Sequence, residues 1–189
     1  MNAVFFLNSI LLGVGLAMDA FSVSLANGMG EPKMRRFKVI AVAGAFAFFQ
    51  ALMPMAGWVA VKTVVSYFTK LQRAVPWIAL LLLLYIGGNM LYDGIKGKAE
   101  GEAASRLTPR VLLLQAIATS IDALSVGFTI AHYSLPAALV CSLTIAAVTF
   151  LICTVGLLIG KRVGTALSDK ASILGGIILI GIGIEIFFS

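Results

Sequence analysis

Two acidic residues lie deep inside long apolar segments of this sequence, where an acid is unusual. Asp19 opens the motif Asp-Ala-Phe-Ser-Val, and Asp122 opens the closely similar motif Asp-Ala-Leu-Ser-Val. An ionised Asp at the centre of a membrane helix costs at least about 2.5–3.5 kcal/mol on insertion scales. Each acid could simply be protonated or bonded to a neighbouring helix. Their recurrence at matching positions of a motif instead favours a function, of which cation binding is the simplest.

Amide and hydroxyl side chains recur near the two acids at helical spacing. The carboxylate and amide candidates for direct cation ligands are Asp19, Asp122, Gln50, Asn27 and Asn89. The candidates for the surrounding pathway are Ser22, Ser125, Thr119, Gln115, Met53, Pro54 and Glu185. One helix face would carry a continuous polar stripe made of Gln115, Thr119, Asp122, Ser125 and Thr129. Such a stripe is expected to face protein or water rather than lipid.

A proline near Gln50 could add a backbone oxygen to this set. Pro54 has no N–H, so the carbonyl of Gln50, four residues earlier, loses its helical partner. Broken helices in transporters use freed carbonyls of this kind to bind cations. An ordinary proline kink, with Met53 filling a gap in the core, is the simpler explanation. A second interruption is expected at Asn27-Gly28, near the end of the first apolar segment.

Two carboxylates with amide, hydroxyl and carbonyl oxygens would form a hard site of formal charge −2, which suits Mg²⁺, Ca²⁺ or Mn²⁺. Zinc and copper prefer Cys and His ligands, and the apolar segments contain no cluster of these residues. The cation is therefore expected as cargo, with no permanently bound cofactor. No nucleotide-binding loop is present, so ion gradients would supply the energy. Exchange against protons is expected, since metal or protons can each neutralise a desolvated carboxylate pair.

The composition requires these residues to sit in membrane helices. Of 189 residues, 60% are hydrophobic and 12% are charged, about half the charge of a soluble domain. A soluble enzyme, a disordered chain and a disulfide-built secreted domain are excluded. The predicted fold is an all-α membrane protein, with spans at about Val4–Ala26, Val39–Val61, Val75–Ile95, Val111–Ala131, Pro136–Ile159 and Ile173–Phe188. No Lys or Arg precedes the first span, so we expect it to be retained rather than cleaved as a signal peptide.

The positive charges give this fold an orientation. Eleven of the 14 Lys and Arg residues lie in the loops after the first, third and fifth spans. The positive-inside rule places these loops in the cytoplasm and both termini outside. The net charge of +6 is therefore assigned to topology, and no nucleic-acid partner is expected. Cys141 and Cys153 are 12 residues apart in one span, about 18 Å along a helix, which is too far for a disulfide.

The sequence contains two similar halves, at about 1–98 and 107–189, joined by a flexible linker at about 96–110. Besides the two Asp motifs, Pro54-Met55-Ala56-Gly57 before Lys62 matches Cys153-Thr154-Val155-Gly156 before Lys161. An odd number of spans per half predicts an inverted repeat, which in secondary transporters places the substrate site near the midplane. Duplication could also be just a way to build six helices, but the repeated acid favours transport.

At these residues the chain resembles the bacterial manganese efflux pump family of the MntP type. The resemblance covers six spans, the Met18-Asp19-Ala20-Phe21 motif, its counterpart Ser120-Ile121-Asp122-Ala123, and the segment Phe49 to Gly57 with the pattern F-Q-x-x-M-P-x-x-G. It implies an inner-membrane exporter that protects the cell from excess Mn²⁺. It also implies that Asp19 and Asp122 are essential acids of the metal pathway. Gln50 stands where some members have Glu, which leaves one charge fewer here.

The sequence thus predicts a non-enzymatic antiporter for manganese homeostasis, with Mn²⁺ as cargo, protons as counter-ion and the lipid bilayer as surroundings. The closest rival is a transporter of another divalent cation or a small cationic solute. A membrane redox protein using its two cysteines and a scaffold without transport of its own are more distant alternatives. A homo-oligomer is open, since Gly156 and Gly160 would allow close helix contact within or between chains.

Overall fold

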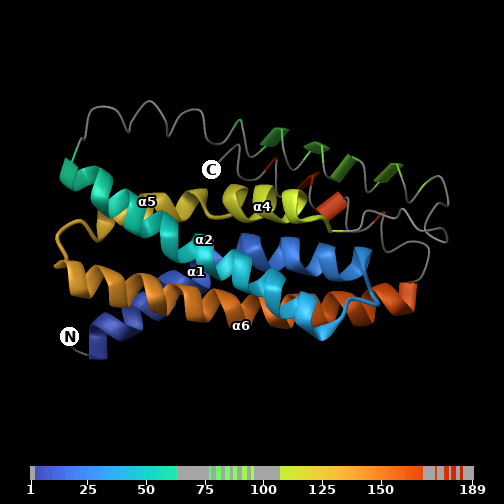
Figure 1. Cartoon of the computed structure of the whole chain (residues 1–189), viewed down its shortest axis with the longest axis horizontal. Helices are drawn as coiled ribbons and strands as arrows, with labels where there is room; N and C mark the ends of the chain where they lie inside the picture. The colour runs from blue at the N-terminus through green and yellow to red at the C-terminus, as the bar shows by residue number, and fades with distance from the viewer. Residues whose placement is uncertain are drawn as a thin grey trace.

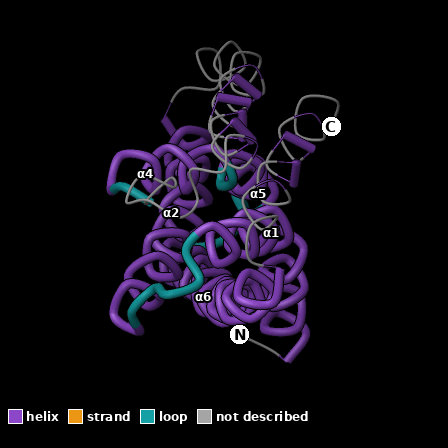
Figure 2. Tube along the Cα trace, turned by 90° about the vertical axis from the view of Figure 1, so that its right-hand side faces the viewer, coloured by secondary structure: helices purple, strands orange, loops and turns teal. Residues whose placement is uncertain are grey.

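The computed structural model describes residues 3–63 and 107–167, with scattered helical residues between 77 and 95 and between 173 and 184. The described part of the chain is helical and contains no strand. Its helices are α1 (Ala3–Gly30), α2 (Arg36–Thr63), α4 (Pro109–Ala118), α5 (Ile121–Thr129) and α6 (Leu135–Leu167). They lie side by side along one axis, as Figure 1 shows from the side and Figure 2 from one end.

Four of the predicted spans are confirmed as helices long and apolar enough to cross a membrane. They are Ala3–Gly30, Arg36–Val61, Pro109–Thr129 and Leu135–Gly164. The predicted third and sixth spans and most of the linker fall on residues that the structure does not describe in full. Many large apolar side chains on the four helices are exposed, among them Phe37 at 82% and Leu143 at 64%. Lipid is the solvent that such a surface requires.

Glycines set the closest contacts between helices. α1 packs mainly against α6, and α2 packs against both α6 and α5. Where α1 meets α6, a Cβ on Gly28 would lie 2.5 Å from the carbonyl oxygen of Leu157. Where α2 meets α5, a Cβ on Gly127 would lie 2.5 Å from the carbonyl oxygen of Pro54. Small residues let backbones approach in this way in membrane proteins.

The predicted interruption at Asn27-Gly28 is wrong, because α1 continues without a break to Gly30. Gly28 serves packing rather than a turn, since α6 runs directly against it. α2 likewise continues through Pro54 as far as Thr63. By contrast, the predicted fourth span is divided into α4 and α5 by a turn at Thr119 and Ser120.

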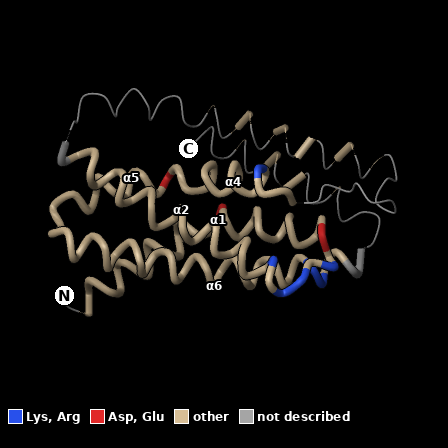
Figure 3. The backbone as a smooth tube through the Cα atoms, in the orientation of Figure 1, with Lys and Arg blue, Asp and Glu red and all other residues tan. Residues whose placement is uncertain are grey.

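The buried apolar side chains form two clusters at different heights in the bundle. The first core cluster includes Val23, Ala26, Val39, Phe46, Ala116 and Leu157. The second core cluster includes Leu16, Ala123, Ile130, Cys141 and Ile145. Lys and Arg gather at the end of the bundle where α1 ends and α2 begins (Figure 3). The first core cluster is the one nearer this basic end, because it also contains Met34 and Leu107.

Candidate functional site

The two repeated acids lie at a similar level of α1 and α5, since Asp19 is eight residues before Asn27 and Asp122 is seven residues after Gln115, the residue to which Asn27 bonds. Their carboxyl groups are close enough for the charge of Asp19 to act on Asp122. The helices run in opposite directions here, since Asn27, later in α1, bonds to Gln115, earlier in α4. Asp19 is half-buried and Asp122 is exposed. Two acids about a hundred residues apart in sequence therefore share one electrostatic environment.

A break in the fourth span places Asp122 in the first turn of α5. Immediately before it, Thr119 donates a hydrogen bond to the carbonyl oxygen of Gln115 at 2.9 Å, and Ser120 donates to that of Ala116 at 2.6 Å. Back-bonding of this kind bends helices. This break was not predicted, and its signal in the sequence is the pair of adjacent hydroxyl residues just before the acid. An acid in the first turn is also favoured by the helix dipole.

Gln50 lies fully buried between α2 and α1. Its side-chain nitrogen donates to the carbonyl oxygen of Leu16 at 3.0 Å, one helical turn before Asp19. Its side-chain oxygen has no hydrogen-bond partner among the described residues. A buried oxygen without a partner costs free energy in a structural role. Gln50 is thus held next to the acid-bearing helix with one oxygen available to a ligand.

Asn27 and Gln115 bond to each other rather than to the site. The Asn27 amide donates to Gln115 Oε1 at 2.8 Å, and the Gln115 amide donates back to Asn27 Oδ1 at 3.2 Å. Both side chains are buried. In this arrangement Asn27 is not a free cation ligand. The sequence could not anticipate the pairing, because the two residues are 88 positions apart.

The remaining predicted residues separate into three groups. Ser22 donates to the carbonyl oxygen of Met18 at 3.1 Å, and Ser125 is exposed close to Asp122. Met53 packs against the second core cluster, as expected for a core residue, and Pro54 is buried inside α2. Asn89 and Glu185 lie outside the described residues. The expected polar stripe is buried at Gln115 and Thr119 and exposed at Asp122, Ser125 and Thr129.

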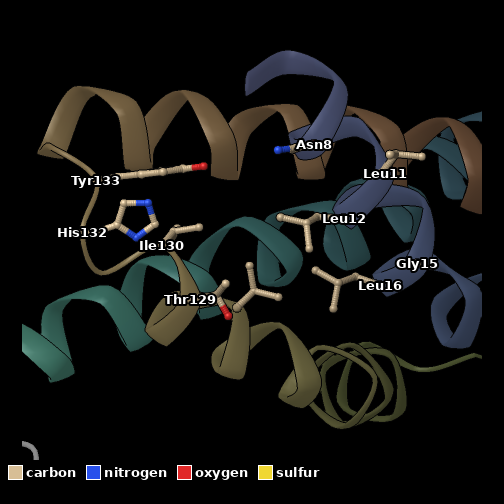
Figure 4. A pocket seen from close by; sticks show the side chains of 10 residues that line it. Asn8, Leu11, Leu12, Gly15, Leu16, Thr129, Ile130, His132 and Tyr133 are labelled. Carbon is tan, nitrogen blue, oxygen red and sulfur yellow. The ribbon is translucent and has the colours of Figure 1, made fainter. Parts of the chain in front are cut away.

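A cavity of about 540 Å³ lies beside the acid pair, on the side away from the basic end. α1 lines it from Asn8 to Leu16, and the α5 end with the following turn lines it from Val126 to Tyr133. Figure 4 shows Asn8 and the Tyr133 hydroxyl pointing toward one another across it, with Leu12 and Leu16 on its wall. Neither Asn8 nor Tyr133 was predicted, because Asn8 lies near the start of its span and Tyr133 lies in the turn after α5, where polar residues are ordinary.

The chemistry of these groups is that of oxygen donors. Among the described residues no cluster of three or more His, Cys, Asp or Glu side chains is placed to hold a metal. The acid pair with the Gln50 oxygen nearby suits a hard or borderline cation that keeps part of its water shell. Cys141 and Cys153 are both free, as expected, and both are buried in α6.

Comparisons with known proteins agree with this picture. The family described as "putative manganese efflux pump" matches residues 31–187. A "putative manganese efflux pump MntP" of Methanosarcina acetivorans is 43% identical over 178 residues, covering 94% of this chain and 93% of that protein. The protein of the same name in Ruminiclostridium cellulolyticum is 41% identical over 180 residues, covering 94% and 93%. No solved structure matches the chain. The chain belongs to the MntP family of manganese efflux pumps.

Proposed function

We propose that the protein exports Mn²⁺ from the cytoplasm in exchange for protons, with Asp19 and Asp122 as the ligands that bind the cation during transport. The observation that carries this proposal is the placement of the two repeated acids at a similar level of the antiparallel helices α1 and α5, beyond the Asn27–Gln115 hydrogen bonds. The names of the family and of the relatives support manganese as the cargo. Carboxylate and amide oxygens are suitable ligands for such a cation.

Proton exchange follows from the charge of the acid pair. Two like charges near each other in a membrane must be neutralised, and either a divalent cation or protons can do this. A site that alternates between the two occupants couples outward movement of the metal to inward movement of protons. The second carboxylate is what permits full exchange, since one acid alone could not balance a divalent charge.

Two equivalent glycine contacts support the inverted repeat. In α2, a Cβ on Gly57 would collide with the carbonyl oxygen of Leu124. In α6, a Cβ on Gly156 would lie 2.9 Å from the carbonyl oxygen of Phe21. Gly57 matches Gly156 in the repeat, and Leu124 matches Phe21 as the third residue of the Asp motif. A symmetric pair of contacts gives the fold two similar arrangements, one open to each side of the membrane.

The proposed location is the bacterial inner membrane, with both termini outside. The gathering of Lys and Arg at one end of the described bundle supports this orientation (Figure 3), because cytoplasmic ends carry the excess of positive charge. In this orientation α1 runs from outside to inside. The cavity then opens on the outer side of the acid pair, and Asn27 with Gln115 lies on the cytoplasmic side.

The test is Mn²⁺ flux into liposomes carrying the purified protein under an imposed pH gradient. We expect gradient-driven flux from the wild type and a loss of at least about tenfold in Asp19→Asn and Asp122→Asn, since ~1.4 kcal/mol of lost binding is already a factor of ten. Ser142→Ala, which changes a buried hydroxyl of α6, is the control. Normal flux from both Asn variants would contradict the site, and flux indifferent to pH would contradict proton exchange.

A further inference from the structure

The acid pair lies between two very different parts of the space that α1 and the α4–α5 span enclose. We infer that the cavity on one side is the exit vestibule for a hydrated divalent cation, and that the Asn27–Gln115 amide pair on the other side is the barrier to the cytoplasm. This inference rests on the proposed export function and goes beyond it by assigning a route and a state. The described structure is then the outward-facing state of the transporter.

The cavity, the acids and the amide pair lie at three successive levels along α1 and the α4–α5 span. The helices are antiparallel, so later residues of α1 lie beside earlier residues of the α4–α5 span. Leu16 and Val126 line the cavity, and Asn27 bonds to Gln115 farther along the same helices. Asp19 and Asp122 lie between these two levels. The acids therefore lie between a hollow segment and a closed segment of the same interface.

The cavity is large enough for a cation that keeps its water. Six waters, the shell of an octahedral divalent ion, occupy roughly 180 Å³ at about 30 Å³ each. The cavity offers about 540 Å³. Its walls are mainly aliphatic, from Leu11 to Leu16, and the polar side chains are few, namely Asn8, Thr129, His132 and Tyr133. Such walls hold a hydrated ion weakly, and weak holding is what release requires.

The cytoplasmic half is closed by polar and apolar contacts together. The Asn27 and Gln115 amides satisfy each other in two hydrogen bonds while fully surrounded by protein. Val23, Ala26 and Ala116 of the first core cluster pack at the same height. Lys161 also ties α6 to the α1–α2 connection, by donating to the carbonyl oxygen of Met34 at 2.6 Å. A hydrated cation would have to separate these contacts to pass between α1 and α4.

An amide pair suits a barrier that must open repeatedly. Each amide carries a donor and an acceptor, so water can replace both partners when the helices separate. A buried ion pair would be harder to separate, because each charge would then lack its partner. The opened pair would also present two neutral oxygens to an entering cation. Asn27 thereby keeps a part in the pathway, as a gate residue that the cation passes before it reaches Asp19.

The experiment locks the amide pair covalently. In a Cys141→Ala/Cys153→Ala background, Asn27→Cys/Gln115→Cys is bridged with a short bifunctional thiosulfonate, and Mn²⁺ flux is measured before bridging, after bridging and after reduction. We expect bridging to reduce flux at least tenfold and reduction to restore it. The matched control is Glu31→Cys/Lys38→Cys, whose native side chains form a 2.5 Å ion pair at the same end without joining α1 to α4. Bridging the control is expected to leave flux unchanged.

A second measurement does not depend on the double variant. In the same cysteine-free background, Thr129→Cys places a thiol at the exposed wall of the cavity. A membrane-impermeant thiol reagent should label it from the outer side in right-side-out vesicles and at a much lower rate in inside-out vesicles. Bridging the amide pair should preserve outer labelling. Labelling only from the cytoplasmic side, or full flux through the bridged protein, would overturn the inference.

The two proposals fail in different ways. If the unmodified protein moves no Mn²⁺, the proposed function fails, while the sidedness of Thr129→Cys labelling still reports whether the cavity opens outward. If Mn²⁺ flux is normal but bridging does not change it, the export function stands and the barrier assignment is wrong. The cysteine-free background must itself transport Mn²⁺, which is expected because both cysteines are free thiols buried in the apolar core clusters and neither belongs to the proposed cation site.

Discussion

At the scale of single residues, the buried amides of this protein do two different things. Asn27 and Gln115 donate to each other in two hydrogen bonds and so join α1 to α4. Gln50 donates through its nitrogen to the Leu16 carbonyl, and its oxygen has no partner among the residues that the structure describes. An unpaired buried oxygen beside an acid-bearing helix is poorly explained by stability, because it carries a desolvation cost. Availability to the cation explains it better.

Gln50→Leu tests this explanation, because leucine has a similar size without the amide. The lost hydrogen bond costs about 1 kcal/mol, and removing the unpaired oxygen recovers part of that cost, so the thermal midpoint should change little. We expect the KM for Mn²⁺ to rise several-fold, while Gln50→Glu should retain export because it restores a carboxylate at this position. Ser142→Ala, which removes another buried unpaired oxygen, serves as control. An unchanged KM in Gln50→Leu would leave the residue a purely structural one.

At the scale of secondary structure elements, the described helices are organised around two glycine-mediated contacts, α1 with α6 and α2 with α5. Each contact brings a carbonyl of one helix against a glycine of the other. The α4–α5 break lies beside the second contact and sets the position of Asp122 at the beginning of α5. Backbone packing of α2 against α5 therefore helps to place Asp122.

Gly127→Ala is expected to destabilise the protein. Its Cβ would lie 2.5 Å from the Pro54 carbonyl oxygen and 2.6 Å from Gly57 Cα, and neither backbone atom can move aside alone. Overpacking of this kind costs about 1–3 kcal/mol, more than the ~1 kcal/mol that alanine gains in helix propensity. Thermal unfolding in detergent should show a lower midpoint. Gly44→Ala, with nothing within 4 Å of its Cβ, should match or exceed the wild-type midpoint; equal loss in both variants would contradict the packing argument.

At the scale of the whole molecule, charge and cavity lie at opposite ends of the acid pair. The Lys and Arg residues gather at the end where α1 passes into α2 (Figure 3), and the cavity lies toward the N-terminus of α1. Trp58 ties the far end of α2 to the α5–α6 turn, by donating to the Tyr133 carbonyl oxygen at 3.1 Å. The two ends of the described bundle thus differ. An exporter that loads on one side and releases on the other needs such a difference.

The orientation is tested by single cysteines in the cysteine-free background. Arg35→Cys and Ser134→Cys lie at exposed positions near opposite ends of the bundle. An impermeant thiol reagent applied to intact spheroplasts should label Ser134→Cys and leave Arg35→Cys unlabelled, and inside-out vesicles should give the reverse. The physical reason is the positive-inside bias of the loops. The opposite pattern would invert the topology, and with it the assignment of the cavity to the outer side.

The sequence by itself determined the membrane class, four spans that the structure confirms, and the family. These follow from local properties: apolar runs of sufficient length, a low fraction of charge, and motifs that are read in one stretch. It also identified the acids and Gln50 as exceptional, because polar groups in an apolar run are conspicuous. The inverted repeat and proton exchange remain predictions.

Only the tertiary structure decided how these residues meet. The pairing of Asn27 with Gln115 and the hydrogen bond from Gln50 to the Leu16 carbonyl join segments far apart in the chain. The first of these contacts also sets Asp19 and Asp122 at a similar level. The expected break at Asn27-Gly28 was wrong for the same reason, since packing against α6 holds that glycine in a continuous helix. Which side of the acid pair is hollow and which is closed depends on antiparallel packing, a property of two helices together that neither sequence segment contains alone.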